Sequence, residues 1–236
     1  MAAILQDLFD TIMDTSGIDY LGIDCVLKRG SGEIIAKQDD ALLIRDSVSE
    51  AYFLACDDAT IGMTLLDRYI GHDCDLLMVS NSNVGKVAFD TYRFTEIHEC
   101  YQVAFYGEKP SIDARISIRT ADEHDLKMLT ENYQMISPDE LEKVVSRRSI
   151  LLGYYQGHLI GFIGEHLEGS MGILYVFPEY RHKGFGTALE TYLIAKTIES
   201  GYIPFAQIEK ENQASLKLQD KIGMTKSDNL ITWMWK

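Results

Sequence analysis

The chain has few cysteines and no long apolar run. Its 236 residues include four cysteines, Cys25, Cys56, Cys74 and Cys100, and no two of them are spaced as CxxC. Because zinc sites usually pair cysteines at that spacing, no metal is expected, and the thiols fit a reducing, intracellular compartment. No segment approaches the roughly 18 consecutive apolar residues of a membrane helix.

Basic residues are also scarce, with 22 Lys and Arg against 36 Asp and Glu and a net charge of −14. Nucleic-acid phosphates and anionic membranes attract clustered Lys and Arg, so neither partner is expected. The deficit is uneven: residues 1–110 carry 8 basic and 19 acidic side chains, and residues 111–236 carry 14 and 17. Any anion-binding site is therefore expected in the second half.

Low-complexity sequence is absent too. Hydrophobic residues make up 46% and charged residues 25%, which are ordinary globular values that exclude a disordered chain. Residues 1–14, MAAILQDLFDTIMD, place acids among apolar residues at helical spacing. This pattern predicts an amphipathic helix rather than a secretion signal, and a soluble cytoplasmic protein.

The segment 106–110, Tyr-Gly-Glu-Lys-Pro, divides the chain, because Gly and Pro with charges between them break regular structure. It predicts one domain over residues 1–110 and a second over 111–236. In the first, a helix is predicted at about residues 60–70. Short runs rich in β-branched and aromatic residues predict its strands at residues 32–37, 41–46, 50–56, 75–80, 86–94 and 101–106.

The second region alternates predicted strands and helices, which indicates an α/β domain with a mixed sheet and one strand–loop–helix crossover after residue 177. The predicted helices cover residues 121–133, a segment opened by Ser137 and Pro138, 184–200 and 212–222. The predicted strands cover residues 114–120, 149–156, 159–167, 172–177, 203–209 and 229–236.

The crossover loop has the composition of an anion-binding site. Arg181, His182 and Lys183 are followed by Gly184 and Gly186, which open a long predicted helix. Glycine allows close backbone approach, and the free N–H groups and dipole of a helix N-terminus attract anions. The predicted ligand group is a phosphate or pyrophosphate. The P-loop pattern is absent, and a leucine stands where the dinucleotide fingerprint needs its third glycine.

Two segments together resemble the GCN5-related N-acetyltransferase (GNAT) superfamily over residues 114–236. Arg181-x-x-Gly184-x-Gly186, after a Val-x-Pro strand end, resembles the loop whose amides hold the pyrophosphate of acetyl-CoA. The segment Ile208-x-x-x-Asn212-x-x-Ser215-x-x-Leu218, ending in Gly-Met, is similar to the family's helix beside CoA, in which the Asn contacts the pantetheine arm.

The resemblance implies a GNAT-like fold that binds acetyl-CoA as acyl donor and needs no metal. It implies direct attack of a neutral amine on the thioester, which requires a base. Glu165 and His166 are adjacent on a predicted strand, so only one can face the acceptor, and Glu165 is preferred. The oxyanion would meet a backbone N–H near Tyr175 and Val176, and Tyr175 is a second catalytic candidate. The implied CoA contacts are Val176, Arg181, His182, Lys183, Gly184, Phe185, Gly186, Thr187, Asn212 and Ser215.

One residue departs from the family pattern. The family often has a tyrosine that protonates the CoA thiolate at the position of Gln219. An amide cannot act as that acid. Either water or another group supplies the proton, or the domain catalyses weakly.

Residues 1–110 leave two hypotheses open. They form a degenerate GNAT-like copy, as in glycine N-acyltransferase-like proteins, which residues 99–106 loosely resemble; or they form an unrelated substrate-binding or dimerising module. Their acidic excess could attract a cationic acceptor. The leading activity is acetyl transfer to a primary amine of a small molecule or peptide, by a monomer or homodimer. The alternatives are a longer-chain or amino-acid N-acyltransferase and a non-catalytic acyl-CoA-binding module.

Overall fold

The structure is a computed structural model that describes residues 17–236, so the helix predicted for residues 1–14 lies outside the described residues. The chain forms two compact units, and neither is continuous in sequence. The first contains the residues up to Val103 together with Gln207–Leu216 and Thr225–Lys236; the second contains Ala104–Ala206 and Lys217–Met224. The domain boundary at residues 110/111 stays a prediction.

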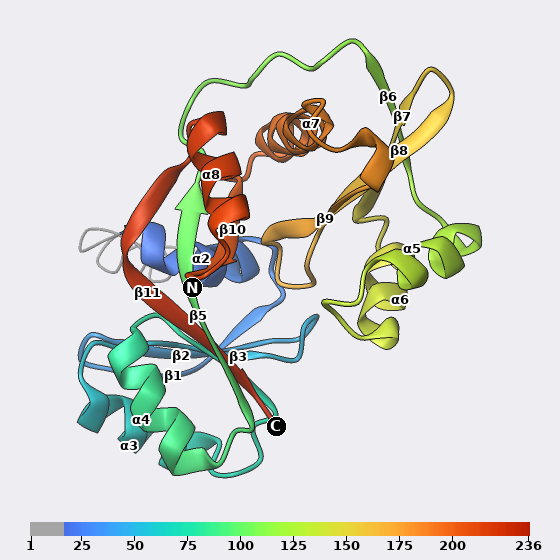
Figure 1. The fold of residues 1–236 in the computed structure, drawn as a ribbon. Helices are drawn as coiled ribbons and strands as arrows, with labels where there is room; N and C mark the ends of the chain where they lie inside the picture. The colour runs from blue at the N-terminus through green and yellow to red at the C-terminus, as the bar shows by residue number, and fades with distance from the viewer. Residues whose placement is uncertain (1–16) are drawn as a thin grey trace. The chain divides into compact units, whose positions relative to one another are not determined.

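The first unit is built on a mixed sheet (Figure 1) with the strand order β1-β2-β3-β4-β11-β5. Strands β1, β2 and β3 are antiparallel, β3 and β4 are parallel, and β11 runs antiparallel to β4. Its elements are the 3-10 turn η1 (Gly17–Tyr20), α2 (Leu21–Lys28), β1 (Gly32–Gln38), β2 (Ala41–Asp46), β3 (Tyr52–Ala55), α3 (Ala59–Tyr69), β4 (Leu76–Val79), α4 (Ser82–Tyr92), β5 (Glu96–Ala104) and β11 (Thr225–Trp235).

Both faces of this sheet are buried. Successive side chains of a strand point to opposite faces, so Leu54 joins one apolar cluster with α3 and α4, while Phe53 joins another with α2. In β4, Val79 likewise belongs to the cluster of Leu54, and Met78 to the cluster of Phe53. In Figure 1, α3 and α4 lie on one side of strands β1 to β3 and α2 on the other. A sheet covered on both faces explains why these strands are continuous apolar runs in the sequence.

The strand predicted at residues 86–94 is wrong, because Ser82–Tyr92 is helix α4. The side chain of Asn81 caps this helix by accepting hydrogen bonds from two backbone N–H groups of the first turn. Val84, Ala88 and Tyr92 recur every fourth residue and are buried. The prediction weighed the β-branched and aromatic content of the segment and missed this helical period.

The second unit has the strand order β10-β9-β8-β7-β6, in which β6 to β9 are antiparallel and β9 is parallel to β10. The mixed α/β fold predicted for this half is confirmed. Strand β10 and helix α8 are divided between the units. The elements are β6 (Ile116–Thr120), η2 (Glu123–Asp125), α5 (Leu126–Asn132), α6 (Pro138–Ser146), β7 (Ile150–Tyr155), β8 (His158–Glu165), β9 (Met171–Val176), η3 (Pro178–Tyr180), α7 (Phe185–Glu199), β10 (Phe205–Glu209) and α8 (Gln213–Ile222).

The same order of elements occurs twice along the chain. Three antiparallel strands, a helix, a strand parallel to the third, a helix and a last strand form β1-β2-β3-α3-β4-α4-β5 and again β7-β8-β9-α7-β10-α8-β11. The sequence has no fixed-period repeat, so the repetition is visible only in the topology. This order supports the hypothesis that the first half is a copy of the second.

Helix α4 packs closely on β11, and Gly85 is the residue that permits the contact. A Cβ at position 85 would lie 2.0 Å from Oγ1 of the buried Thr232. We expect Gly85→Ala to lower the free energy of unfolding by about 1–3 kcal/mol through overpacking. Urea unfolding measures this change. The control is Val87→Ala, at an exposed position of the same helix, which should change the free energy of unfolding by less than about 0.5 kcal/mol. Equal effects of the two substitutions would contradict the packing argument.

Candidate functional site

The loop after β9 holds two of its cations against its own backbone. Arg181 Nε donates to the carbonyl of Val176 at 2.9 Å, and Lys183 Nζ donates to the carbonyl of Glu179 at 2.7 Å. The guanidinium of Arg181 also lies over the ring of Tyr175, 5.5 Å from its centroid. Both positive charges are thus fixed beside the start of α7.

Helix α7 begins without a side-chain cap. Gly184 is its N-cap residue and adopts φ 84°, a left-handed conformation that favours glycine. In contrast, α3, α4 and α6 are each capped by the side chain of Asp58, Asn81 or Ser137. The first N–H groups of a helix have no partner inside the helix. At α7 these N–H groups have no side-chain acceptor among the described residues, and the dipole and the nearby cations favour an anion there.

A third cation lies at this loop and was missed from the sequence. Arg115 Nη2 would be 3.8 Å from a Cβ on Gly184, and its guanidinium lies 5.5 Å from the ring centroid of Phe185. Asp113 Oδ2 lies 2.6 Å from Arg115 Nη2 and forms an ion pair with it. No local pattern could reveal Arg115, because the contact joins residues far apart in the sequence.

The other predicted loop residues differ in what they can offer. His182 is exposed and has a left-handed backbone, φ 60°. The ring of Phe185 is buried beside Tyr155 and Tyr180, at 5.1 and 6.1 Å between centroids. Phe185 can therefore present only its backbone N–H to a ligand. Thr187, one residue after Gly186, follows in the same first turn of the helix.

The backbone of β9 is irregular at Ile173. The sequence predicts the oxyanion-binding N–H further along the strand, near Tyr175 and Val176. Tyr175 and Val176 pair regularly with Phe162 and Gly161 of β8, and the register shifts between Phe162 and Gly164. Ile173 adopts φ 50°, a strained conformation for a β-branched residue. Among the described residues, β9 pairs with β10 at a single position. The ring of Tyr175 is stacked on Phe162, which places it in the packing of the sheet.

Tyr133, at the end of α5, reaches this irregular backbone. Burial raises the pKa of its hydroxyl to about 12, against a hydrogen bond from the backbone of Ile173. The neutral hydroxyl accepts this hydrogen bond at the distorted residue of the strand. No local sequence pattern indicates this contact.

Glu165 and His166 point to different helices, as their alternation on a strand predicts. The carboxylate of Glu165 accepts a hydrogen bond from Thr197 Oγ1 of α7 at 3.3 Å. His166 Nδ1 lies 3.7 Å from a carboxylate oxygen of Glu140 on α6. Burial opposes charge on His166, but Glu140 and Glu168 together raise its pKa. The role of Glu165 as base stays a prediction.

The second motif begins with a helix cap in the first unit. Asn212 Oδ1 accepts a hydrogen bond from the backbone N–H of Ser215 at 3.1 Å, which makes Asn212 the cap of α8. Since the carbonyl oxygen is used in the cap, the amide NH2 is the part that can donate to a ligand.

Gln219 is not exposed on α8. Its Nε2 donates to Glu190 Oε1 of α7 at 2.6 Å, and both side chains are buried. Burial raises the pKa of Glu190 to about 7. Glu190 was not among the residues that sequence reasoning selected, because a lone glutamate in a helix indicates a solvated position.

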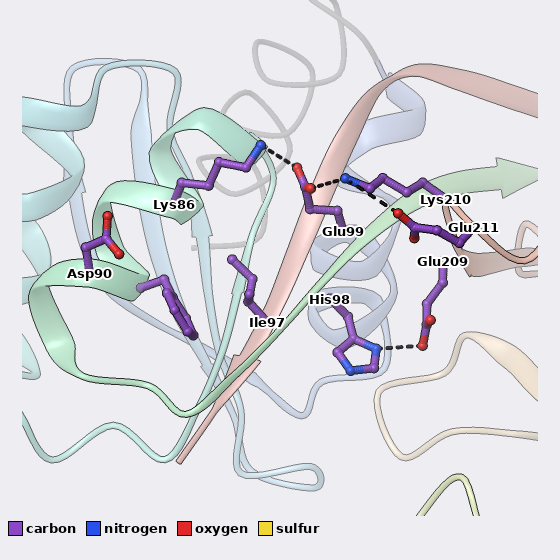
Figure 2. Close-up of a pocket in the computed structure, with 9 residues that line it drawn as sticks. Lys86, Asp90, Ile97, His98, Glu99, Glu209, Lys210 and Glu211 are labelled. Atoms are coloured by element: carbon purple, nitrogen blue, oxygen red, sulfur yellow. Dashed lines mark hydrogen bonds and ion pairs between the residues drawn. The ribbon is translucent and has the colours of Figure 1, made fainter.

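The first unit holds a cavity of about 440 Å³ in which opposite charges are paired (Figure 2). Glu99 of β5 lies between Lys86, at 2.7 Å, and Lys210, and His98 Nδ1 lies 2.6 Å from Glu209 Oε1. The lining residues are Lys86, Phe89, Asp90, Ile97, His98, Glu99, Glu209, Lys210 and Glu211.

This ion-pair network fixes the turn between β10 and α8. The backbone N–H of Lys210 donates to the carbonyl of Glu99 at 3.0 Å, in addition to the ion pair of their side chains. Lys210 precedes the cap residue Asn212 by two positions. Hydrogen bonds from Lys210 and then Lys86 lower the pKa of Glu99, so its carboxylate stays charged.

Two further properties concern the described part of the chain. Within residues 17–236, no three His, Cys, Asp or Glu side chains are grouped to hold a metal ion. No helix in that range combines the length and apolar character that crossing a membrane would require.

Comparison with solved structures gives the fold. A Drosophila protein aligns over 100% of this chain and 97% of its own, with TM-score 0.71 and 17% identity. A GCN5-related N-acetyltransferase from Kribbella flavida covers 93% and 94%, with TM-score 0.57 and 11% identity. A GCN5-related N-acetyltransferase-like protein from Streptococcus suis covers 97% and 100%, with TM-score 0.54 and 14% identity. No curated protein sequence matches the chain.

The fold is therefore that of the GCN5-related N-acetyltransferases. Within that class, residues 151–234 match the family model of FR47-like proteins, which is of GNAT type. The GNAT assignment of the second half, predicted from the loop and the Asn helix, is confirmed.

The Glu99 network should stabilise the first unit in a pH-dependent way. We expect Glu99→Gln to lower the free energy of unfolding at neutral pH by about 1 kcal/mol, since both lysines are partly exposed. Because the folded state lowers the Glu99 pKa, its contribution is present above the ordinary value of 4.5 and is lost as the pH falls through the folded value.

Urea unfolding of this variant at neutral and acidic pH checks that expectation. The matched control is Asp90→Asn, which removes an exposed carboxylate from the same cavity. A Glu99→Gln effect that persists undiminished in acid would show that lost packing, rather than lost charge, causes it.

Proposed function

We propose that the protein is an N-acetyltransferase that moves the acetyl group of acetyl-CoA to a primary amine of a small molecule or peptide. The observation that carries the proposal is the start of α7, where uncapped N–H groups meet two fixed cations. A pyrophosphate has the negative charge and the acceptor oxygens that this arrangement needs. The GNAT-type match of residues 151–234 supports the same ligand.

The chemistry follows from the thioester. A neutral amine attacks the carbonyl carbon, the C–S bond breaks, and the amine loses a proton while the CoA thiolate gains one. Strand β9 pairs with β10 at a single position, and we propose that the rest of that edge of β9 offers a backbone N–H group to the developing oxyanion. Ile173, whose backbone already donates to Tyr133, is where the strand is distorted. Glu165 is the proposed base. We propose water as the donor to the thiolate, since Gln219 cannot supply a proton.

The first unit does not share this role. The helix that corresponds to α7 in the repeated order is α3, and Asp58 caps it by accepting from the backbone N–H groups of Thr60 and Ile61 at 2.7 and 3.1 Å. Asp57 adds a second negative charge. The N–H groups that would hold a pyrophosphate are occupied, and the local charge repels phosphate. We infer that the first unit is a degenerate copy without an acyl-CoA site.

One observation favours a second candidate, a non-catalytic acyl-CoA-binding module. The side chain at the position of the family's acid is bonded inside the protein, Gln219 to Glu190. A longer acyl donor is a variant of the first candidate. The acceptor we propose is an amine, in keeping with the acidic character of residues 1–110.

A thermal shift assay separates these candidates. At a hundredfold excess over its Kd, acetyl-CoA should stabilise the protein by about 2.7 kcal/mol, with coenzyme A as the second ligand. Turnover is then measured as free thiol released with a panel of amines. A shift with thiol release supports the enzyme, and a shift without release supports the binding module. A larger shift with a longer acyl-CoA supports the longer-chain donor.

Gly184→Asp should abolish acetyl-CoA binding, with Kd raised more than about 100-fold, because the carboxylate repels the pyrophosphate at the N–H groups that hold it. Gly157→Asp is the matched control: Gly157 lies on the β7–β8 turn, adopts φ 81°, and has no atom within 4 Å of its would-be Cβ. Both variants carry the same backbone strain and added charge. Calorimetric titration measures Kd, and equal Kd values for the two variants would exclude the pyrophosphate site.

A further inference from the structure

Glu190 and Gln219 form an isolated polar pair inside the second unit. Glu190 lies on α7 and Gln219 on α8, and only 3% and 4% of their surfaces are exposed. Gln219 Nε2 donates to Glu190 Oε1 at 2.6 Å. Two polar side chains withdrawn from water in this way need a partner for every polar atom.

Two polar atoms of the pair, one on each side chain, lack a hydrogen-bond donor when Glu190 is ionised. Glu190 Oε2 and Gln219 Oε1 are both buried and have no hydrogen-bond donor among the described residues. A carboxylate oxygen and an amide oxygen can only accept, so neither can satisfy the other. One proton on Oε2 converts it into a donor. In a planar acid–amide pair that donor faces the amide oxygen, and a single proton then satisfies both atoms.

No nearby charge holds Glu190 in its ionised form. Gln219 is the one polar group that acts on its carboxyl; no Lys, Arg, His, Asp or other Glu in the described chain contributes. Burial dominates and raises the Glu190 pKa to about 7, although the hydrogen bond from Gln219 opposes this. The shift agrees with the count of donors and acceptors.

We propose that Glu190 carries a proton in the folded protein and forms a two-bond acid–amide pair with Gln219 that fastens α8 to α7, so that ionisation of Glu190 weakens acyl-CoA binding. The binding clause rests on the proposed function. Within the second unit, α7 begins at the Gly184 loop, and Gln219 lies on the part of α8 that belongs to the same unit. Glu190 is thus a positioning residue, because the pair sets where α7, whose start holds the proposed pyrophosphate, lies on that part of α8.

The pH dependence has a defined sign. The folded state raises the Glu190 pKa above its ordinary value of 4.5, so the folded chain keeps a proton that the unfolded chain releases. The stabilisation by the protonated pair is complete below about 4.5 and is lost as the pH rises through about 7. This is the reverse of the behaviour of an exposed, ion-paired carboxylate.

Glu190→Gln is the informative substitution. Its amide NH2 replaces the acid O–H as donor to Gln219 Oε1 and does not titrate. We expect the urea midpoint of the wild type to fall relative to that of Glu190→Gln between pH 5 and about 8. Glu199→Gln, which changes the exposed carboxylate of Glu199 on the same helix, should keep the wild-type profile. Parallel profiles for the wild type and Glu190→Gln would overturn the protonated pair.

A second readout does not depend on unfolding. The infrared carbonyl absorption of protonated carboxylic acids at mildly acidic pH should be weaker in folded Glu190→Gln than in the folded wild type, by the contribution of one carboxyl group. Identical spectra for the two proteins would also overturn the protonated pair, even if the variant proved less stable.

Acetyl-CoA titration tests the link to binding. Between mildly acidic and mildly basic pH, the Kd of both proteins is measured. The fold-increase in Kd of the wild type should be at least about three times the fold-increase of Glu190→Gln. If neither protein binds acetyl-CoA, the proposed function fails, while the unfolding and infrared results still decide the protonation. If both bind with the same pH dependence, the link between the pair and binding is overturned.

Discussion

Helix α7 must find partners for its first N–H groups, and no side chain within residues 17–236 supplies them. At α3 and α4 the same need is met by Asp58 and Asn81. The repeated order of elements therefore places one chemical requirement at two points and satisfies it in two ways. In the first copy an internal carboxylate completes the helix, which closes the position to ligands. In the second, glycine and fixed cations leave it to an external anion.

Features that depend on neighbouring residues could be predicted from the sequence, and features that depend on distant contacts could not. The Arg181–Gly186 loop and the Asn212 cap are local patterns, and the structure has an uncapped helix start and a capped helix there. Helix α4 was mistaken for a strand because its β-branched content outweighed its four-residue period. Arg115 has no local signature, because the fold alone brings it beside Gly184.

The same reasoning explains why Gln219 was ambiguous in the sequence. Considered alone, it is only the absence of an acid at the position where the family often has a tyrosine. The structure shows that its side chain faces Glu190, inside the protein. The residue is thus an element of the packing between two helices.

A buried acid–amide pair is a costly way to join two helices. Apolar side chains of similar volume would pack in its place without desolvating a carboxyl group, and such replacements often increase stability. What an apolar pair lacks is directionality and a dependence on protons. The bond from Gln219 Nε2 to Glu190 Oε1 exists whether or not Glu190 is ionised, whereas the second bond of the proposed pair exists only while Glu190 is neutral. The proposed pair therefore lowers the stability of the protein at high pH, and it holds α7 and α8 in one register. It thus bears on where α7, which begins at the Gly184 loop, lies against the part of α8 formed by residues 217–222.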